Sequence, residues 1–243
     1  MYRAIHAASV IATIERLHAR ITERFAGRGL AAVCAELADV ARRDRDRVKA
    51  LSRANPFVRA GLIAIGVLLA VALGFVVKDF RLAGVIRALS PEDERGAMLT
   101  FFQGVDSAVN ILLLCGAGLF FLLQHEERRK RRLALDDLYE LRSIAHVIDM
   151  HQLTKDPTTL LAREKRTASS PAETMTPFEL VRYLDYCSEM LSLVAKVAAL
   201  YSQDMRDPVV IEAVSDLEAM TADLSREVWQ KIMIVEQMQR TAG

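Results

Sequence analysis

The sequence has little proline and glycine, with six prolines and eleven glycines among 243 residues. Both residue types interrupt regular secondary structure. Alanine, leucine, arginine and glutamate dominate instead, and these residues favour helices over strands. We therefore expect an all-α protein.

Cysteine is also scarce: the three cysteines, Cys34, Cys115 and Cys187, lie far apart, and none has a CxxC or other metal-ligand spacing. An odd number without a framework is typical of reduced thiols facing a cytosol. We expect each to be a small buried apolar side chain rather than a reactive thiol.

Charge of one sign is not in excess, because the formal net charge is only +1. This balance gives no overall basic field for nucleic acid, so we expect no nucleic-acid partner. Charged residues make up 26% of the chain beside 52% hydrophobic residues. That mixture indicates membrane spans attached to a substantial water-soluble part.

Recognisable catalytic patterns are missing: the chain has no GxSxG, P-loop, GxGxxG, HExxH or kinase signature. We therefore expect no enzyme activity and no cofactor. The Gly-Met-Asn and Asp-Ile-Met-Glu signatures of two-span magnesium and calcium channels are absent as well.

Two long uncharged runs are present, at residues 60–77 and 107–124. Each run has about the length that a helix needs to cross a bilayer. They predict transmembrane helices at 57–77 and 107–124, paired as a helical hairpin. The loop 78–106 between them carries a helix start at Ser90-Pro91. The chain start is too weakly apolar for a cleavable signal, so the first span would be its own membrane signal.

Basic residues flank the two spans unevenly. Seven lie in the twenty residues before the first uncharged run (40–59) and six in the twenty after the second (125–144), but the loop 78–106 has four. The positive-inside bias therefore predicts cytoplasmic termini in a cell membrane, and we expect this to be a bacterial inner membrane. The densest basic run is Arg128, Arg129, Lys130, Arg131 and Arg132. It serves either as this topological anchor or as a site for lipid headgroups.

The N-terminal region, residues 1–56, reads as a cytoplasmic pair of helices at 2–26 and 30–53, separated by Gly27-Arg28-Gly29. Val10, Ile14, Leu17, Ile21 and Phe25 give the first helix one apolar stripe. The helix either packs on the second as a hairpin or lies on the membrane, because its other face is rich in arginine.

The C-terminal region reads as three cytoplasmic helices that form a bundle. The first continues the second span through 125–156, and a flexible connector follows at 157–175. A helical hairpin then occupies 176–243. Its first helix starts with a capping box formed by Thr176 and Glu179, and its second follows Asp207-Pro208. The apolar stripe of this last helix is Ile211, Val214, Leu217, Met220, Leu224, Val228, Ile232 and Val235.

Two features of the spans predict assembly. Gly66, Ala70 and Gly74 recur every four residues, and such small side chains let another helix approach closely, so we expect a homo-oligomer. Polar side chains stand one turn apart where the second span begins, and they could line a pore. These residues are Gln103, Asp106 and Asn110.

The cluster most like a metal site is HVIDMH, where His146 and Asp149 share a helix face and His151 points elsewhere. Other helices would have to supply further ligands, with Asp185, Cys187 and Glu189 as candidates. A polar surface cluster explains the same residues, so no metal ligand is assigned.

The sequence therefore predicts a non-enzymatic membrane protein: an oligomeric helical scaffold or sensor that binds a cytoplasmic protein partner through residues 126–238. The alternative is an oligomeric ion channel or transport subunit whose second span lines the pore. In both cases the lipid bilayer is the first partner.

Overall fold

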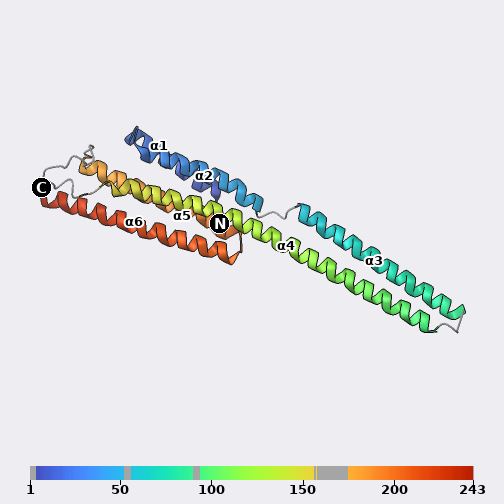
Figure 1. The fold of residues 1–243 in the computed structure, drawn as a ribbon. Coiled ribbons are helices and arrows are strands. Elements are labelled where there is room, and N and C mark those ends of the chain that lie inside the picture. The colour runs from blue at the N-terminus through green and yellow to red at the C-terminus, as the bar shows by residue number, and fades with distance from the viewer. Residues whose placement is uncertain (1–3, 52–55, 90–93, 156, 158–174, 243) are drawn as a thin grey trace. The chain divides into compact units, whose positions relative to one another are not determined.

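The computed structural model describes residues 4–51, 56–89, 94–155, 157 and 175–242. These residues form six helices and no strand (Figure 1), which confirms the all-α prediction. The helices are α1 (Ala7–Arg24), α2 (Gly29–Leu51), α3 (Pro56–Leu89), α4 (Glu94–Leu153), α5 (Pro177–Asp204) and α6 (Pro208–Ala242).

The chain divides into two compact units. The first, which we call the bundle, comprises Met1–Ser52 and Arg131–Gly243. The second, the apolar unit, comprises Arg53–Lys130. The 60-residue helix α4 contributes its N-terminal part to the apolar unit and its C-terminal part to the bundle.

The apolar unit consists of α3 and the first part of α4. Among the described residues, one helical stretch is long and apolar enough to cross a membrane, within Phe102–Leu153 of α4. Its most apolar window has a mean hydropathy of 1.9 and is only 6% buried. The described apolar part of α3, Val58–Val71, is shorter. Helix α3 continues to Leu89, into the predicted loop, because no proline interrupts it before Pro91.

Helix α4 is continuous from Glu94 through the second predicted span to Leu153, three residues before the end of the predicted extension 125–156. The predicted helix start at Ser90-Pro91 and most of the connector 157–175 lie outside the described residues.

The bundle is organised around α5, which packs against α1, α2 and α6. Its buried side chains include Tyr183, Tyr186 and Tyr201, each at most 2% exposed. Helix α4 adds Leu141 and Ile148 to the same core. The core therefore contains residues from all five helices that reach this unit, which establishes the predicted helical bundle.

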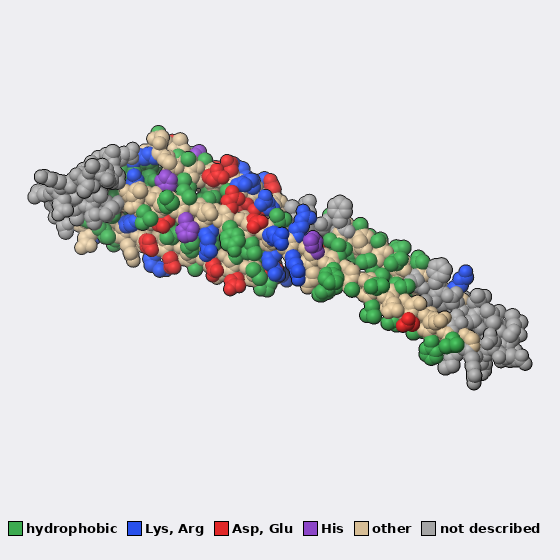
Figure 2. Space-filling view, viewed as in Figure 1, with side chains coloured by type: hydrophobic (Ala, Val, Ile, Leu, Met, Phe, Trp, Pro, Cys, Tyr) green, Lys and Arg blue, Asp and Glu red, His purple; other side chains and the backbone are tan. Residues whose placement is uncertain are grey.

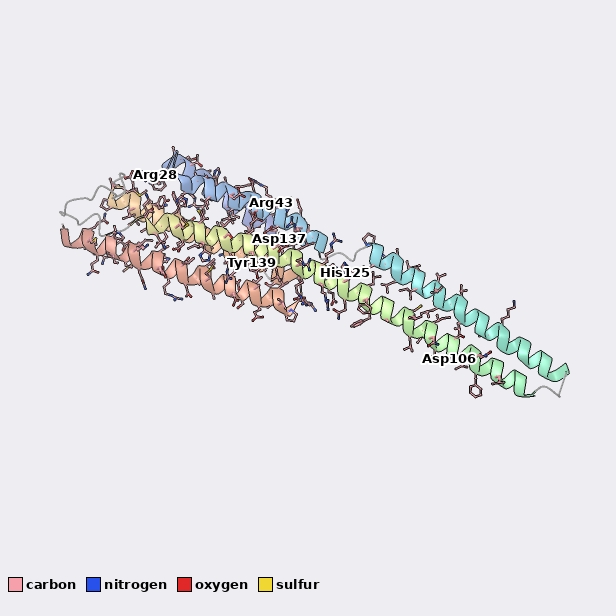
Figure 3. The ribbon with its side chains drawn as sticks, viewed as in Figure 1. Arg28, Arg43, Asp106, His125, Asp137 and Tyr139 are labelled. Atoms are coloured by element: carbon pink, nitrogen blue, oxygen red, sulfur yellow. The ribbon has the colours of Figure 1, made fainter. Side chains whose placement is uncertain are left out.

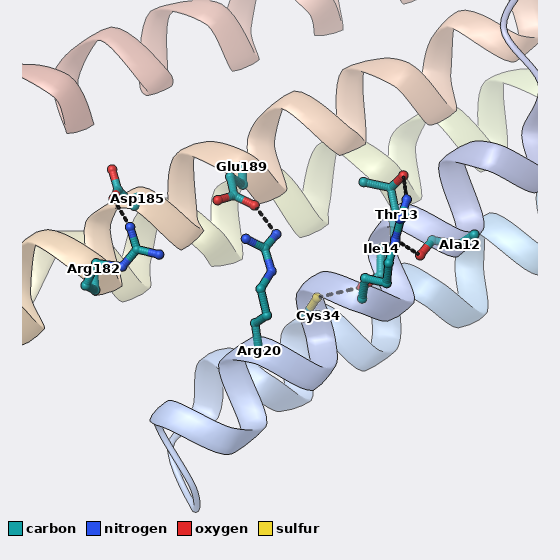
Figure 4. Close-up of polar contacts among 9 residues, drawn as sticks. Ala12, Thr13, Ile14, Arg20, Cys34, Arg182, Asp185 and Glu189 are labelled. Atoms are coloured by element: carbon teal, nitrogen blue, oxygen red, sulfur yellow. Dashed lines mark hydrogen bonds and ion pairs between the residues drawn. The ribbon is translucent and has the colours of Figure 1, made fainter.

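The sequence left two arrangements open for the first helix: packing on the second helix as a hairpin, or lying on the membrane. The structure shows the hairpin. Gly27 makes the turn with φ +74°, a conformation that glycine adopts without steric cost. All five residues of the predicted stripe on α1 are buried. Cys34 of α2 contacts the Ile14 carbonyl at 3.8 Å, and Arg20 pairs with Glu189 of α5 at 2.6 Å (Figure 4). Helix α1 therefore packs on protein.

The starts of α5 and α6 follow from their capping residues. The Thr176 hydroxyl accepts the Glu179 N–H at 3.2 Å, and the Glu179 carboxylate accepts the Thr176 N–H at 2.8 Å, which confirms the capping box. At α6, the Asp207 carboxylate accepts the N–H groups of Val209 and Val210 at 3.0 and 3.3 Å.

One member of the predicted stripe on α6 is wrong. Ile211 is 44% exposed, whereas the neighbouring Val210 is buried. Successive helical residues are about 100° apart around the axis, and Val210 lies in phase with Val214 and Leu217. Val210 therefore occupies the core position that was predicted for Ile211.

Candidate functional site

A pair of buried carboxyl groups lies where α2, α4 and α5 meet in the bundle. Asp44 of α2 and Asp137 of α4 are each 2% exposed, and Tyr201 of α5 is fully buried beside them. Figure 3 shows Asp137 on the side of α4 toward α2. Buried aspartates are rare in protein interiors unless they are paired, so the partners of each are decisive.

Asp137 has a partner for each carboxylate oxygen. Oδ1 accepts a hydrogen bond from Arg47 of α2, and Oδ2 accepts the Tyr201 hydroxyl at 2.7 Å. A carboxylate that accepts a charged and a neutral donor is stabilised in its ionised form. Both carboxylate oxygens of Asp137 are therefore hydrogen-bonded, one of them to a cation.

Asp44 differs, because its Oδ2 atom is buried and has no hydrogen-bond partner among the described residues. Burial and then the negative charge of Asp137 raise the pKa of Asp44 from 3.8 to about 7, although Tyr201 and Arg47 act in the opposite direction. Burial, together with the charge of Asp44, also raises the pKa of Tyr201, so this hydroxyl stays protonated. Near neutral pH, Asp44 is thus the group that exchanges a proton.

The charges at this site balance only when Asp44 is protonated. The Arg47–Asp137 ion pair has no net charge, and ionisation of Asp44 adds a negative charge in a region of low dielectric constant. Arg43, another cation of α2, is already paired with Glu140 of α4 at 2.6 Å. The arrangement can therefore take up or release a proton, and the proton changes how well α2, α4 and α5 pack.

Asp44 and Asp137 are not among the site residues predicted from the sequence, although their spacing indicates burial. Residues 41–49 of α2 have the sequence ARRDRDRVK, a run dominated by charged side chains. Asp44 lies three residues after Ala41 and four before Val48, both buried, so it occupies a core position of α2. Asp137 likewise lies between the buried residues Ala134 and Leu141. The sequence therefore did contain an indication of the site: on each of two helices, an aspartate has the same helical spacing as the buried apolar residues.

The proposed HVIDMH cluster does not converge. The His146 side chain is exposed, and Asp149 accepts a hydrogen bond from Gln152. His151 instead faces α2 and α5: its Nδ1 lies 3.3 Å from the Tyr183 hydroxyl, and burial lowers its pKa. Within the described part of the chain, no three His, Cys, Asp or Glu side chains are grouped to hold a metal.

The other suggested ligands have separate roles. Asp185 pairs with Arg182 at 3.0 Å on the same helix, and Glu189 pairs with Arg20 (Figure 4). Cys187 is buried, and burial raises the pKa of its thiol to about 12. Burial raises the pKa of Cys34 to about 12 as well, which makes both thiols poor nucleophiles.

The five residues of the basic run, 128–132, differ in their ion pairs. Arg131 binds the Asp207 carboxylate at 2.7 Å and so joins α4 to the start of α6. Lys130 pairs with Glu126 at 2.7 Å within α4. Three members make no ion pair with the described residues and are exposed: Arg128, Arg129 and Arg132. The sequence presented these five cations as equivalent, and packing distinguishes them.

The predicted pore residues Gln103, Asp106 and Asn110 are exposed on α4. The Asn110 amide donates to the Asp106 carboxylate at 3.4 Å. Figure 3 places Asp106 and His125 at opposite ends of the apolar stretch of α4. Among the described residues these side chains contact nothing that would define a pore, so their role stays a prediction about the assembled protein.

Helix α3 contacts α4 at Gly61, and not through the small-residue stripe of Gly66, Ala70 and Gly74. A Cβ atom added to Gly61 would lie 2.9 Å from Leu122 of α4, but one added to Gly66 or Gly74 would have no atom within 4 Å. Ala70 is also exposed. None of the described residues therefore covers the stripe.

Comparison with known proteins adds no relative: no family model, curated protein or solved structure matches this chain. Function is therefore inferred from the geometry.

Proposed function

We propose that this protein is a non-enzymatic, membrane-anchored helical scaffold or sensor whose bundle binds a cytoplasmic protein partner. In this proposal α3 and α4 carry two membrane spans in a bacterial inner membrane, and both termini are cytoplasmic. The uneven distribution of basic residues supports that orientation.

Exposed apolar side chains support the membrane anchor. In the apolar unit, Val67, Leu68, Leu113, Leu114 and Phe121 are each more than half exposed (Figure 2). Water-soluble monomers rarely leave an apolar surface of this extent uncovered. Carbonate washing tests the anchor: we expect the protein to stay in the membrane pellet at high pH. Release into the wash would contradict it.

The observation that carries the sensor proposal is the continuity of α4. One unbroken helix, Glu94–Leu153, contains the membrane-length apolar stretch and, further along, the buried Asp137. Asp137 is bonded to α2 through Arg47 and to α5 through Tyr201. A change in the packing of the bundle around Asp137 therefore acts on the same helix that enters the membrane.

Exposed apolar residues of the bundle suggest where a partner binds. Tyr139 and Met150 of α4 are 61% and 65% exposed, and they lie eleven residues apart, on one face of the helix. Exposed aromatic and methionine side chains are enriched at protein interfaces. We therefore propose this face of α4 as the partner-binding surface.

Affinity purification from crosslinked membranes tests the partner. The variant Tyr139→Ser/Met150→Ser should lose a protein that the wild type retains. The matched control Ile211→Ser/Met233→Ser changes two residues of α6 that are also exposed; it should keep that protein. If the wild type returns only itself, the scaffold proposal is wrong.

The homo-oligomer is part of the same proposal, supported by the open stripe of Gly66, Ala70 and Gly74. The mass of the detergent-solubilised protein, with the detergent subtracted, tests it. A dimer has too few spans to enclose a polar pore and would favour the scaffold. A larger closed ring would justify conductance measurements on Asp106→Ala, the residue on which the channel alternative depends.

A further inference from the structure

The apolar stretch of α4 ends in a surface hollow with two different halves. Phe120, Phe121, Gln124, His125 and Arg128 line a space of about 310 Å³. The two phenylalanine side chains are 59% and 71% exposed. All five residues belong to the apolar unit and to one helix, so the hollow does not depend on other parts of the chain.

The polar side of this hollow contains an arginine that forms no ion pair with the described residues. Arg128 lines the hollow, and Arg129 is the next residue of α4, outside the lining. Both side chains are exposed and bind no carboxylate among the described residues, whereas Lys130 is paired with Glu126. Gln124 and His125 add further nitrogen atoms beside Arg128. Arginine is the side chain that binds phosphate oxygens with two parallel hydrogen bonds.

We propose that this hollow binds an anionic phospholipid. Arg128 and Arg129 would bind its phosphate, Gln124 and His125 would contact the polar headgroup, and an acyl chain would lie along Phe120 and Phe121. The inference rests on the membrane anchor proposed above and adds the chemical class of lipid that the anchor recognises.

Charge and shape together point to a lipid rather than to a free anion. A phospholipid has an anionic end joined to an apolar chain. The hollow has two exposed aromatic rings followed along α4 by the cation Arg128, with Arg129 next to it in the chain. A free phosphate would use the arginines and leave both rings uncovered. Aromatic rings at the headgroup level and arginines that extend toward the interface are typical of membrane helix ends.

Native mass spectrometry of the full-length protein in detergent tests the proposal. The protein is titrated with phosphatidylglycerol and, separately, with phosphatidylcholine of the same acyl chains. We expect tighter binding of phosphatidylglycerol. Each arginine near an anionic lipid contributes roughly a factor of five, so Arg128→Gln/Arg129→Gln should weaken phosphatidylglycerol binding by about 30-fold. Phosphatidylcholine binding should weaken much less, because its choline cation already offsets the charge of the phosphate.

The matched control is Arg142→Gln/Arg240→Gln, which removes the same charge from exposed arginines of the bundle. Arg142 lies on α4, about 21 Å along the helix axis from Arg128, beyond the screening length of about 8 Å at physiological salt. This control should bind phosphatidylglycerol like the wild type. An equal loss in both variants would mean a general charge effect and would overturn the proposal.

Two further arms complete the test. Phe120→Ala/Phe121→Ala should weaken both lipids, because both share the acyl chains. Glycerol 3-phosphate should not displace phosphatidylglycerol at equal concentration; if it does, the site binds a free anion and the proposal is wrong. Equal affinity of the wild type for both lipids also overturns it. Release of the protein by carbonate would instead defeat the membrane anchor.

Discussion

The charge state of Asp44 should control the stability of the bundle, and Asp44→Asn tests this directly. The carboxyl group is 2% exposed, and its pKa is about 7 in the folded protein against an ordinary value of 3.8. Between pH 3.8 and about pH 7, Asp44 therefore keeps its proton in the folded state, whereas the same side chain has already released it in the unfolded chain. Wild-type stability must fall as the pH rises through this window and level off above about 7.

The magnitude follows from the same two pKa values. A separation from 3.8 to about 7 corresponds to roughly 4 kcal/mol in total, of which about 2.5 kcal/mol falls between pH 5 and pH 8. Asparagine cannot ionise, so the variant lacks this dependence. Its free energy of unfolding relative to wild type should rise by about 2–3 kcal/mol from pH 5 to pH 8. An unpaired amide costs about 1–3 kcal/mol at both values and cancels from the difference.

Urea denaturation of the full-length protein in detergent measures this difference, with helix content and the fluorescence of Trp229 as signals; Trp229 is the single tryptophan and lies in α6 of the bundle. The matched control is Asp46→Asn, an exposed carboxylate two residues away on α2 whose partner is Arg45. Its effect should barely change between the two pH values. If Asp44→Asn has the same effect at pH 5 and pH 8, Asp44 does not exchange its proton in this range and the reasoning fails.

Other predictions concern the same bundle. Tyr201→Phe removes the donor to buried Asp137 and should cost about 1–3 kcal/mol of stability in urea denaturation; an unchanged midpoint would show that the carboxylate finds another donor. Asp207→Ala removes the cap of α6 and its ion pair with α4, so the free energy of unfolding should fall by about 1–2 kcal/mol, measured in the same assay, and no fall would contradict the capping role. At pH 8, Cys34 and Cys187 should react with iodoacetamide about 1000-fold more slowly than in the denatured chain, because burial raises each pKa from 9.0 to about 12; mass spectrometry after a timed reaction checks this, and rapid labelling of either would contradict its burial.

Local patterns in the sequence determined most of the helical framework. The spacing of Val10, Ile14 and Leu17 defined the buried face of α1, because residues three or four apart share one side of a helix. Thr176 and Glu179 identified the start of α5, since a capping box needs only neighbours in the chain. The uncharged run at 107–124 identified the apolar stretch of α4 by length and composition alone.

Tertiary structure decided which polar residues belong together. Asp44, Asp137 and Tyr201 lie on three helices, and only the packing of α2, α4 and α5 turns them into one proton-exchanging site. The basic run shows the same effect: Arg131 is bound to Asp207, which lies 76 residues later, whereas Arg128 is left without a described partner. Periodicity specifies the faces of a helix, but contacts between residues far apart in the chain depend on how those faces are packed against one another.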